Sequence, residues 1–435
     1  MKKSLYLVLL LSVVLSAGCC KACKNGDNGD ATAPRSVDAS CAACNAKDAP
    51  KDLESLDPFK PTLFANLGDT LYTPDGMVVD AEKKIAYLNV PNFAFKDENG
   101  KKLNSHQGGY LLKVSPDGKY ETLLEYPIYE PTGQTGPMGI SIGPDGNLYV
   151  CDNQFFYNTD YQSRILRVVM KDGKPTGDVQ TVVEGIKLAN AVTWFNNRMF
   201  YTDSNLQIED QNAEEWIGSG AVFMFEGDEV LKAGTEGNPP IKVTSADTDS
   251  HCLTIQKARK IGRGDNTGAD GMTVDTKTGV IYFGHFGDGR MFAIYPNEDG
   301  SYSGENTVCI YDPIDVPADG ETAPGSGLVL QCCDGIYYDA ATNKVFQNDS
   351  LNNAIWYFTP VAKGEKIQYN LLWKNGDCDG NDGLLDQPCE CVVIDGKLII
   401  VGFDWPFPGM VNTKAEAPGT LSVIDISSLQ APAAN

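Results

Sequence analysis

The stretch from 270 to 285 decides the fold, and it reads Asp-Gly-Met-Thr-Val-Asp-Thr-Lys-Thr-Gly-Val-Ile-Tyr-Phe-Gly-His. Two runs rich in apolar residues flank a polar turn that ends in glycine, which is the pattern of a β-hairpin. Five other stretches repeat the pattern with small variations, namely 75–90, 138–152, 190–203, 334–349 and 390–404. The chain therefore contains six equivalent hairpins.

The spacing of the hairpins predicts what surrounds them. They recur roughly every 50 to 80 residues, so each has room for two more strands. Such strands are expected at 109–114, 164–169, 221–225, 290–295 and 354–358. Six four-stranded units predict an all-β fold, a six-bladed β-propeller, whereas a pair of β-sandwiches would not produce six equivalent hairpins. We expect the strand near 62–67 to pair with 420–424 and close the ring, so that neither end leaves a bare edge.

Composition limits the partners of this protein. Of its 435 residues, 35 are Lys or Arg and 58 are Asp or Glu, which gives a formal net charge of −23. A chain this acidic lacks the basic surface that binds nucleic acid, and anionic lipid would repel it. Its three histidines nearly exclude a His-rich zinc site. We expect a small-molecule substrate or ligand, no nucleic acid, and a monomer.

The first residues are typical of an export signal. Lys2 and Lys3 precede an apolar run at 5–11 that is too short to be a stable membrane span. Residues 15–19, Leu-Ser-Ala-Gly-Cys, resemble a bacterial lipobox, with cleavage before Cys19 and lipid attached to its sulfur. A plain secretory signal with a chance cysteine is the alternative. The lipobox predicts a protein tethered by lipid at the bacterial cell envelope, on the periplasmic or outer-membrane face.

The sequence predicts four segments: a signal peptide at 1–18, a flexible stalk at 19–57, the propeller at 58–428 and a tail at 429–435. The stalk carries two Cys-x-x-Cys pairs, at 20–23 and 41–44. These pairs could hold zinc or an iron–sulfur cluster, but disulfides or free thiols are the favoured interpretation in an exported stalk.

The cysteine count also bears on the compartment. Setting Cys19 aside leaves 12 of the 13 cysteines, an even number that suits an oxidising environment. Four of them lie beside ring positions of adjacent blades, and inter-blade disulfides are expected there rather than redox catalysis: Cys332, Cys333, Cys389 and Cys391.

The innermost strand of each blade lines the central channel, so equivalent positions form a ring. In blade order the ring is Asp75, Met138, Asn190, Asp270, Asp334 and Glu390. Carboxylates facing one axis repel each other if no cation lies between them, and converging oxygen ligands suit calcium. The sequence predicts one calcium ion in the channel, with every ring residue except Met138 as a ligand. The alternative is that each Asp only caps the tight glycine turn beside it.

A family resemblance appears at the fourth hairpin. Residues 270–275, followed by Gly-Arg-Met at 289–291 and Tyr-Pro at 295–296, resemble the signature segment of the senescence marker protein/gluconolactonase family. Its members are six-bladed, calcium-dependent propellers that hydrolyse lactones, with paraoxonases and diisopropyl fluorophosphatase as more distant relatives. Residues 189–191 and 201–204 are similar to the Asn-Gly blade of that family. The resemblance covers roughly residues 60 to 425.

This resemblance implies that Asp75, Asn190 and Asp270 are metal ligands, with Asp270 also the acid/base or nucleophile. Asp75 stands where the family usually has Glu. At 136–139 the chain reads Gly-Pro-Met-Gly, where the family usually carries Arg and Asn-Asp-Gly for substrate. Met138 binds neither a sugar hydroxyl nor a hard cation, which favours a more apolar substrate than a sugar lactone.

The second strand of each hairpin returns to the face on which the first begins. This places five strand-end residues around the pocket rim, and Met138 joins them there from the ring: Asp152, Asp203, His285, Asp349 and Asp404. His285 is the one histidine within a repeat and could act as a general base beside Asp270. A satisfied structural histidine is the alternative.

Residues 375–386 imitate a calcium-binding EF-hand loop, with acidic side chains at 377, 379 and 386. The flanks are not helical, and Asn375 is unusual at the first place of such a loop. A plain acidic turn is the favoured interpretation, and a loop-bound calcium is the alternative.

Two functions remain open. The first is a calcium-dependent hydrolase of lactones or esters, in which the metal polarises the carbonyl and a carboxylate activates water or attacks directly. The second is a non-catalytic propeller that binds a ligand or a protein at the cell envelope. The acidic ring favours the first, and the loss of the family's substrate-binding residues favours the second.

Overall fold

The computed structural model describes residues 58–93, 108–157, 161–205, 216–259, 267–313, 332–405, 407 and 409–429. All of them belong to the second of two compact units, 37–435. The predicted lipidation site Cys19, the signal peptide and the cysteine-containing stalk lie outside the described residues. Within the described part, no helix has both the length and the apolar character needed to cross a membrane.

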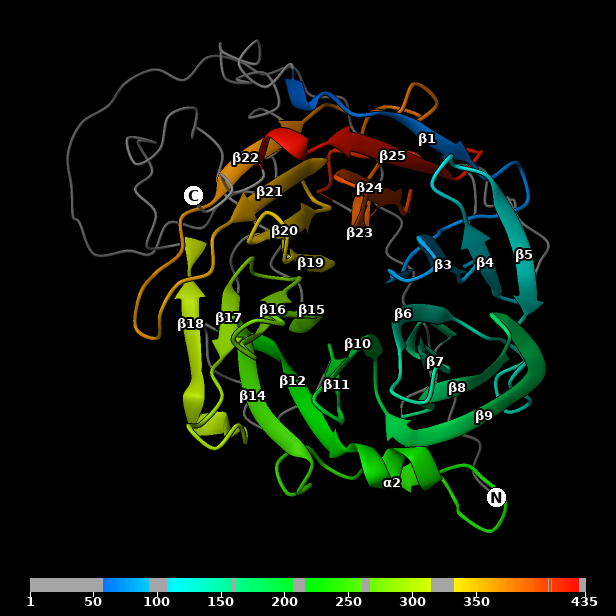
Figure 1. The fold of residues 1–435 in the computed structure, drawn as a ribbon, viewed down its shortest axis with the longest axis vertical. Coiled ribbons are helices and arrows are strands. Elements are labelled where there is room, and N and C mark those ends of the chain that lie inside the picture. Colours follow the sequence, from blue (N-terminus) through cyan, green and yellow to red (C-terminus); the bar gives the residue numbers. More distant parts are fainter. Residues whose placement is uncertain are drawn as a thin grey trace, which may run out of the picture. The chain divides into compact units, whose positions relative to one another are not determined.

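Six antiparallel sheets stand around a central axis, as the ribbon in Figure 1 shows. Blades 1 to 3 are built as follows: β2 (Met77–Asp80), β3 (Ile85–Val90), β4 (Tyr110–Val114) and β5 (Tyr120–Glu125); β6 (Pro137–Ile142), β7 (Leu148–Asp152), β8 (Ser163–Lys171) and β9 (Lys174–Ile186); β10 (Ala189–Phe195), β11 (Arg198–Asp203), β12 (Trp216–Glu226) and β14 (Cys252–Arg259). Blades 4 to 6 follow: β15 (Ala269–Val274), β16 (Ile281–His285), β17 (Met291–Ile294) and β18 (Thr307–Tyr311); β19 (Ile336–Asp339), β20 (Lys344–Asp349), β21 (Ala354–Phe358) and β22 (Asn370–Lys374); β23 (Pro388–Ile394), β24 (Lys397–Gly402), β25 (Thr420–Asp425) and β1 (Thr62–Asn66). The predicted six-bladed propeller is confirmed.

Few other elements are present among the described residues. The short strand β13 (Ile241–Lys242) adds to blade 2 in parallel with β9, and α2 (Gly227–Lys232) follows β12. Three short 3₁₀ helices lie in loops: η3 (Phe155–Tyr157), η4 (Gly304–Asn306) and η6 (Ser427–Leu429).

The ring closes as expected. The N-terminal strand β1 pairs antiparallel with β25, with Thr62 opposite Val423 and Asn66 opposite Thr420. Blade 6 therefore combines three strands from the C-terminal end of the propeller with one from its beginning, as the blue β1 beside the red β25 shows in Figure 1. Each innermost strand contacts the innermost strand of the next blade, and β23 contacts β2. No innermost strand is left as an exposed edge.

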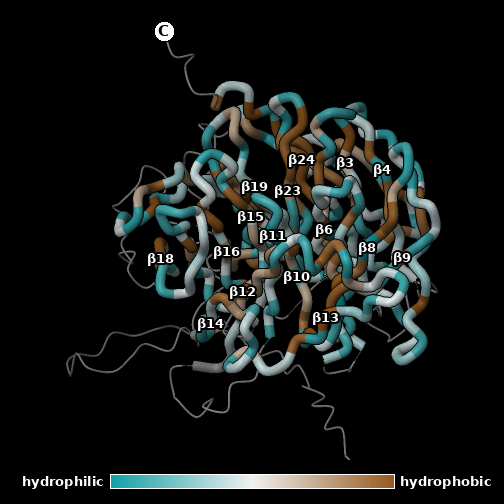
Figure 2. Tube along the Cα trace, turned by 60° about the horizontal axis from the view of Figure 1, so that its bottom comes forward, coloured by the Kyte–Doolittle hydropathy of each residue, from teal (hydrophilic) through white to brown (hydrophobic). Residues whose placement is uncertain are grey.

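The blades pack face to face, so a middle strand is buried on both sides. All five residues of β16 and all five of β7 are buried. The apolar cluster between blades 3 and 4 joins Phe200 and Val222 to Met272 and Phe283. This double burial explains why the second arm of each hairpin is a nearly continuous apolar run. Figure 2 shows the brown strands inside and the teal turns at the surface.

Glycine follows four ring positions because neighbouring blades meet there through their backbones. A Cβ at Gly271 would lie 2.2 Å from the carbonyl oxygen of Asp334, and one at Gly335 would lie 2.3 Å from that of Cys389. Gly139 stands in the same relation to Asn190 of the next blade. The glycine of the repeated motif therefore allows the inner strands to approach closely.

Candidate active site in the central channel

A cavity of about 270 Å³ lies at the axis, and five of the six ring residues line it. Asp75, Asn190, Asp270 and Asp334 contribute from four different blades, with Met138 between the first two. Asn190 and Asp270 lie at the start of β10 and β15, while Asp75 and Asp334 lie just before β2 and β19. Glu390 is not among the lining residues, but the carboxylates of Asp75 and Asp334 act on it electrostatically. The structure therefore brings four of the five predicted ligands to one cavity.

The carboxylates of the ring are held away from solvent and close enough to repel one another. Asp75 is 7% exposed, and burial together with the Asp334 carboxylate holds the pKa of Asp75 well above its usual range. Burial also raises the pKa of Glu390, and the Asp75 and Asp334 carboxylates raise it further. The site therefore favours either protonated carboxyl groups or a bound cation.

The carboxylate oxygens of the ring differ in their hydrogen-bond partners. Ser350 donates a hydrogen bond from its hydroxyl group to Asp334, and the Cys391 N–H donates to Glu390 Oε1 at 2.8 Å. Asp75 Oδ2, in contrast, is buried and has no hydrogen-bond partner. A buried carboxylate oxygen without a partner is costly, so this atom fits a site built for a ligand.

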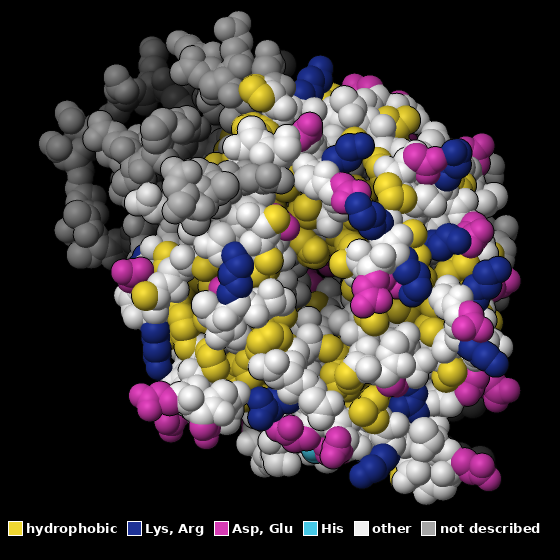
Figure 3. All heavy atoms as spheres, in the orientation of Figure 1, with side chains coloured by type: hydrophobic (Ala, Val, Ile, Leu, Met, Phe, Trp, Pro, Cys, Tyr) yellow, Lys and Arg dark blue, Asp and Glu magenta, His cyan; other side chains and the backbone are white. Residues whose placement is uncertain are grey.

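The upper wall of the cavity is aromatic, which sequence reasoning did not foresee. Its large apolar residues are Phe155, Phe156, Leu188, Phe286, Phe403 and Phe407. The phenylalanines come from loops after β7, β16 and β24, and Leu188 comes from the connection between β9 and β10. The ring of Trp405 lies 5.5 Å from that of Phe156. Figure 3 looks along the axis onto the hollowed centre, where acidic side chains appear between hydrophobic ones. The expectation of a more apolar substrate than a sugar lactone stays a prediction.

His285 does not line the cavity. Its side chain is fully buried between blades 3 and 4, with the ring centre 4.8 Å from that of Phe292. Its Nδ1 lies 3.4 Å from Asp288 Oδ1, and burial lowers its pKa despite that carboxylate. Arg290 pairs with Asp288 on the same side. Because β16 alternates, His285 shares the face of Ile281 and Phe283, which explains why it points into the blade interface.

The four aspartates expected on the rim are also absent from the cavity lining. Asp152 accepts the Gly136 N–H at 2.8 Å and pairs with Arg164, whose Nε lies 3.0 Å away. Asp203 accepts the N–H groups of Lys187 and Leu188 at 3.0 and 2.9 Å. An Asp at the end of the second strand thus fixes the segment that enters the first strand of the same blade.

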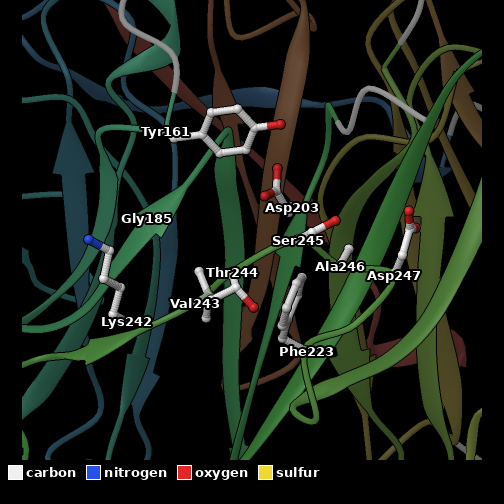
Figure 4. A pocket seen from close by; sticks show the side chains of 10 residues that line it. All are labelled: Tyr161, Gly185, Asp203, Phe223, Lys242, Val243, Thr244, Ser245, Ala246 and Asp247. Atoms are coloured by element: carbon white, nitrogen blue, oxygen red, sulfur yellow. The ribbon is translucent and has the colours of Figure 1, made fainter. Parts of the chain in front are cut away.

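The other two rim candidates also accept hydrogen bonds. Asn352 donates to Asp349 Oδ2 at 2.9 Å, and Asn412 donates to Asp404 Oδ1 at 3.0 Å. Asp203 lines a different pocket of about 380 Å³, between Tyr161 and the segment at 242–247 (Figure 4). The acidic strand end therefore holds the entry to the inner strand at Asp152 and Asp203, and none of the four aspartates lines the central cavity.

The expected inter-blade disulfides are not shown. Cys389 and Cys391 are both unpaired thiols, so neither bridges to Cys332 or Cys333. The Cys389 thiol donates to the carbonyl oxygen of Pro74 at 3.4 Å, beside Asp75. Burial raises the pKa of Cys389 well above its usual range, and the nearby carboxylates raise it further, so this thiol stays protonated.

Comparisons with known proteins bear on the fold. No family model matches the chain, and no curated protein matches it. Similar solved structures include a gluconolactonase from Xanthomonas campestris, at 11% identity and a TM-score of 0.45, covering 85% of this chain and 96% of that one. A calcium-binding protein, regucalcin, from Agrobacterium tumefaciens aligns at 12% identity and 0.44, covering 84% and 95%.

A protein of another activity aligns equally well. The PQQ-bound aldose sugar dehydrogenase from Streptomyces coelicolor gives 14% identity and a TM-score of 0.48, covering 84% of this chain and 97% of that one. The propellers that the sequence motif resembles are thus found among the structural neighbours, at the level of the fold. Unrelated functions can share one fold, so the residues of the cavity decide what this chain can do.

Proposed function

We propose that the central cavity binds a divalent cation, calcium by the nature of its ligands, and hydrolyses lactones or esters with an apolar body. The observation that carries the proposal is the pairing of an acidic floor with an aromatic wall in one cavity. Asp75, Asp270 and Asp334 supply the floor, and phenylalanines from three loops supply the wall. Such a pocket orients an apolar substrate with its carbonyl toward the acidic end.

The residues of the floor fit a hard cation. Carboxylate and amide oxygens are the ligands that calcium prefers, and Asp75, Asn190 and Asp270 offer them from three blades. The unpartnered Asp75 Oδ2 and the raised pKa of Asp75 both describe a carboxylate that a cation would satisfy. When bound, the ion would act as a Lewis acid on a carbonyl oxygen.

The chain itself supplies the remaining parts of the reaction. Asp270 is 2% exposed at the start of β15, and Thr202 fixes its backbone by donating to its carbonyl oxygen at 2.7 Å. A carboxylate held in this way can take a proton from water that attacks the carbonyl carbon. The phenylalanines exclude bulk water from the acidic end and contact the apolar part of the substrate.

A non-catalytic binding module is the second candidate, and one observation favours it. The cavity wall contains no histidine among the described residues, because His285 is turned into the blade interface. A small apolar ligand could bind to the same aromatic wall without any reaction. Export and attachment through Cys19 are proposed for either function, since they rest on the N-terminal sequence alone.

The hydrolase is tested with Asp270→Asn. Screening aryl esters, lactones and organophosphates with calcium present should give activity that this variant lowers about 100-fold or more, the scale for losing a positioned base. Asp339→Asn is the control, because Asp339 is also buried but lies at the other end of an innermost strand, where Thr342 N–H donates to it. Elemental analysis of both variants reports whether the metal is kept. If the wild type hydrolyses none of these compounds, or if the Asp270 variant hydrolyses them equally well, the hydrolase proposal is wrong. The non-catalytic binding module would then be the remaining candidate.

A further inference from the structure

A second group of acidic residues lies in blade 6, outside the central cavity. Asp386, Asp404 and Glu416 each place one carboxylate oxygen within 4.8 Å of the others. We call them the blade-6 cluster. Among the described residues, no other three His, Cys, Asp or Glu side chains gather this closely, the ring carboxylates included. The three residues come from two connections: Asp386 precedes β23, while Asp404 and Glu416 lie at the two ends of the connection between β24 and β25.

The cluster is built inside the protein. Asp386 is 4% exposed and Asp404 is 6% exposed, while Glu416 is half-buried. Asp386 Oδ1 is buried and accepts no hydrogen bond, and the same is true of Glu416 Oε2. An isolated buried carboxylate normally finds donors or loses its charge. Two such oxygens in one cluster indicate that a ligand completes the site.

The charges around the cluster are also acidic. Burial, then the carboxylates of Asp404, Glu416, Asp377 and Asp379, raise the pKa of Asp386 to about 9, and the pKa of Asp404 rises to about 8 for similar reasons. Lys414 opposes the rise of the pKa of Glu416 but leaves it above the usual range. Among the described residues, the carboxylates of this neighbourhood therefore outweigh its positive charge.

The loop at 375–386 is held in place to present these groups. Asn375 closes it through both amide atoms, accepting the Leu385 N–H at 2.9 Å and donating to the Leu385 carbonyl at 2.8 Å. Asp377 accepts from the Thr413 N–H at 3.3 Å, which joins this loop to the one that carries Glu416. A Cβ at Gly383 would lie 1.8 Å from Leu63 N, so the loop rests directly on β1.

We propose that the blade-6 cluster is a binding site for a divalent cation, calcium, formed by Asp386, Asp404 and Glu416 and separate from the ion of the central channel. The ligands are carboxylates without imidazole, which favours a hard cation over zinc or copper. The nearby Cys378 thiol is turned away and donates to the Leu385 carbonyl at 3.1 Å. Bound there, the ion ties the loop before β23 to both ends of the β24–β25 connection, beside the closure of the ring.

The proposal is tested by calcium titration of the metal-free full-length protein in a calorimeter. Glu416→Gln should remove one binding event or weaken it by about tenfold or more, because it deletes a charged ligand. Asp386→Asn should do the same. Asp382→Asn is the matched control, since Asp382 lies exposed on the same loop and only caps the Leu384 N–H at 2.9 Å. This variant should bind as the wild type does.

A second measurement assigns the event to blade 6. In hydrogen exchange, calcium should protect the peptides at 375–386 and 409–419 in the wild type and in Asp75→Asn, but not in Glu416→Gln. Asp75→Asn should remove only the event of the central channel. If Glu416→Gln and Asp386→Asn bind calcium with the wild-type stoichiometry and affinity, or if calcium protects neither loop of the wild type, the site does not exist. If the central channel binds no calcium, the binding and the protection at blade 6 should still be observed, so the two proposals can fail independently.

Discussion

The close approach of the inner strands gives a quantitative prediction for Gly271→Ala. A methyl group at this position would lie 2.2 Å from the carbonyl oxygen of Asp334 and 2.7 Å from the Cα of Gly335. Both are backbone atoms of the next blade, so no side chain can rotate to make space. Overpacking of this kind costs about 1–3 kcal/mol. The opposed gain from stiffening the unfolded chain is only about 0.4–1 kcal/mol.

Urea unfolding followed by tryptophan fluorescence measures the difference. Gly271→Ala should lower the midpoint, while Gly376→Ala should leave it unchanged or raise it slightly, because no atom lies within 4 Å of a Cβ at Gly376. Blade 3 supplies an internal comparison, since Ala191 follows its ring residue and the structure accommodates that methyl group. If Gly271→Ala unfolds at the wild-type midpoint, the inner strands do not meet as closely as the structure shows.

Two further predictions concern other parts of the chain. Burial raises the pKa of Asp349 to about 6, with Asn352 and Lys374 opposing the rise, so the folded state keeps a proton that the unfolded state releases near pH 4. The unfolding free energy should therefore fall by up to about 3 kcal/mol between pH 4 and 6 through this group. Asp349→Asn should remove that fall in thermal scans across the same pH range. If the stability of the wild type and of the variant changes with pH in parallel, the prediction is wrong. Cys19→Ala should move the protein from the membrane fraction into the soluble one on cell fractionation, and a variant that stays with membranes after a high-salt wash would refute the lipobox.

The fold could be predicted because its determinants are local and repeated. Each hairpin carries its own alternation and turn, and the same Asp-Gly or similar pair begins the inner strand in several blades. Ring closure by β1 and β25 could be predicted because a propeller leaves no edge unpaired. The ring at the axis could be predicted because equivalent positions of the six hairpins lie at the same height in every blade. Four of its five expected ligands line one cavity.

The aromatic wall could not be predicted in the same way. Phe156 and Phe407 lie in loops without periodicity, so nothing in the sequence places them over the channel. The signal that was present is positional: both follow a second strand of a hairpin within a few residues, at the face where the ring begins. The direction of His285, in contrast, could have been predicted from its alternation with Ile281 and Phe283 on β16.

The blade-6 cluster could be predicted only in part from the sequence of its loop. The sequence at 375–386 gave the acidic loop but not its partners, because Asp404 and Glu416 lie 18 and 30 residues after Asp386 and reach it only through the sheet. Asn375, at the first place of the loop, closes the loop through Leu385 instead of facing the cluster. The EF-hand likeness is therefore limited to composition.

The two acidic sites are connected through adjacent residues that face opposite ways. Asp386 belongs to the blade-6 cluster, while Gln387 lines the central cavity; Asp404 belongs to the cluster, while Phe403 lines the cavity. Gln387 Oε1 also accepts the Trp405 N–H at 2.5 Å, which joins the two segments between the sites. A cation that fixes Asp386 and Asp404 would therefore fix the wall of the cavity as well. With that cation bound, the acidic loop would help to shape the pocket without any contact with the substrate.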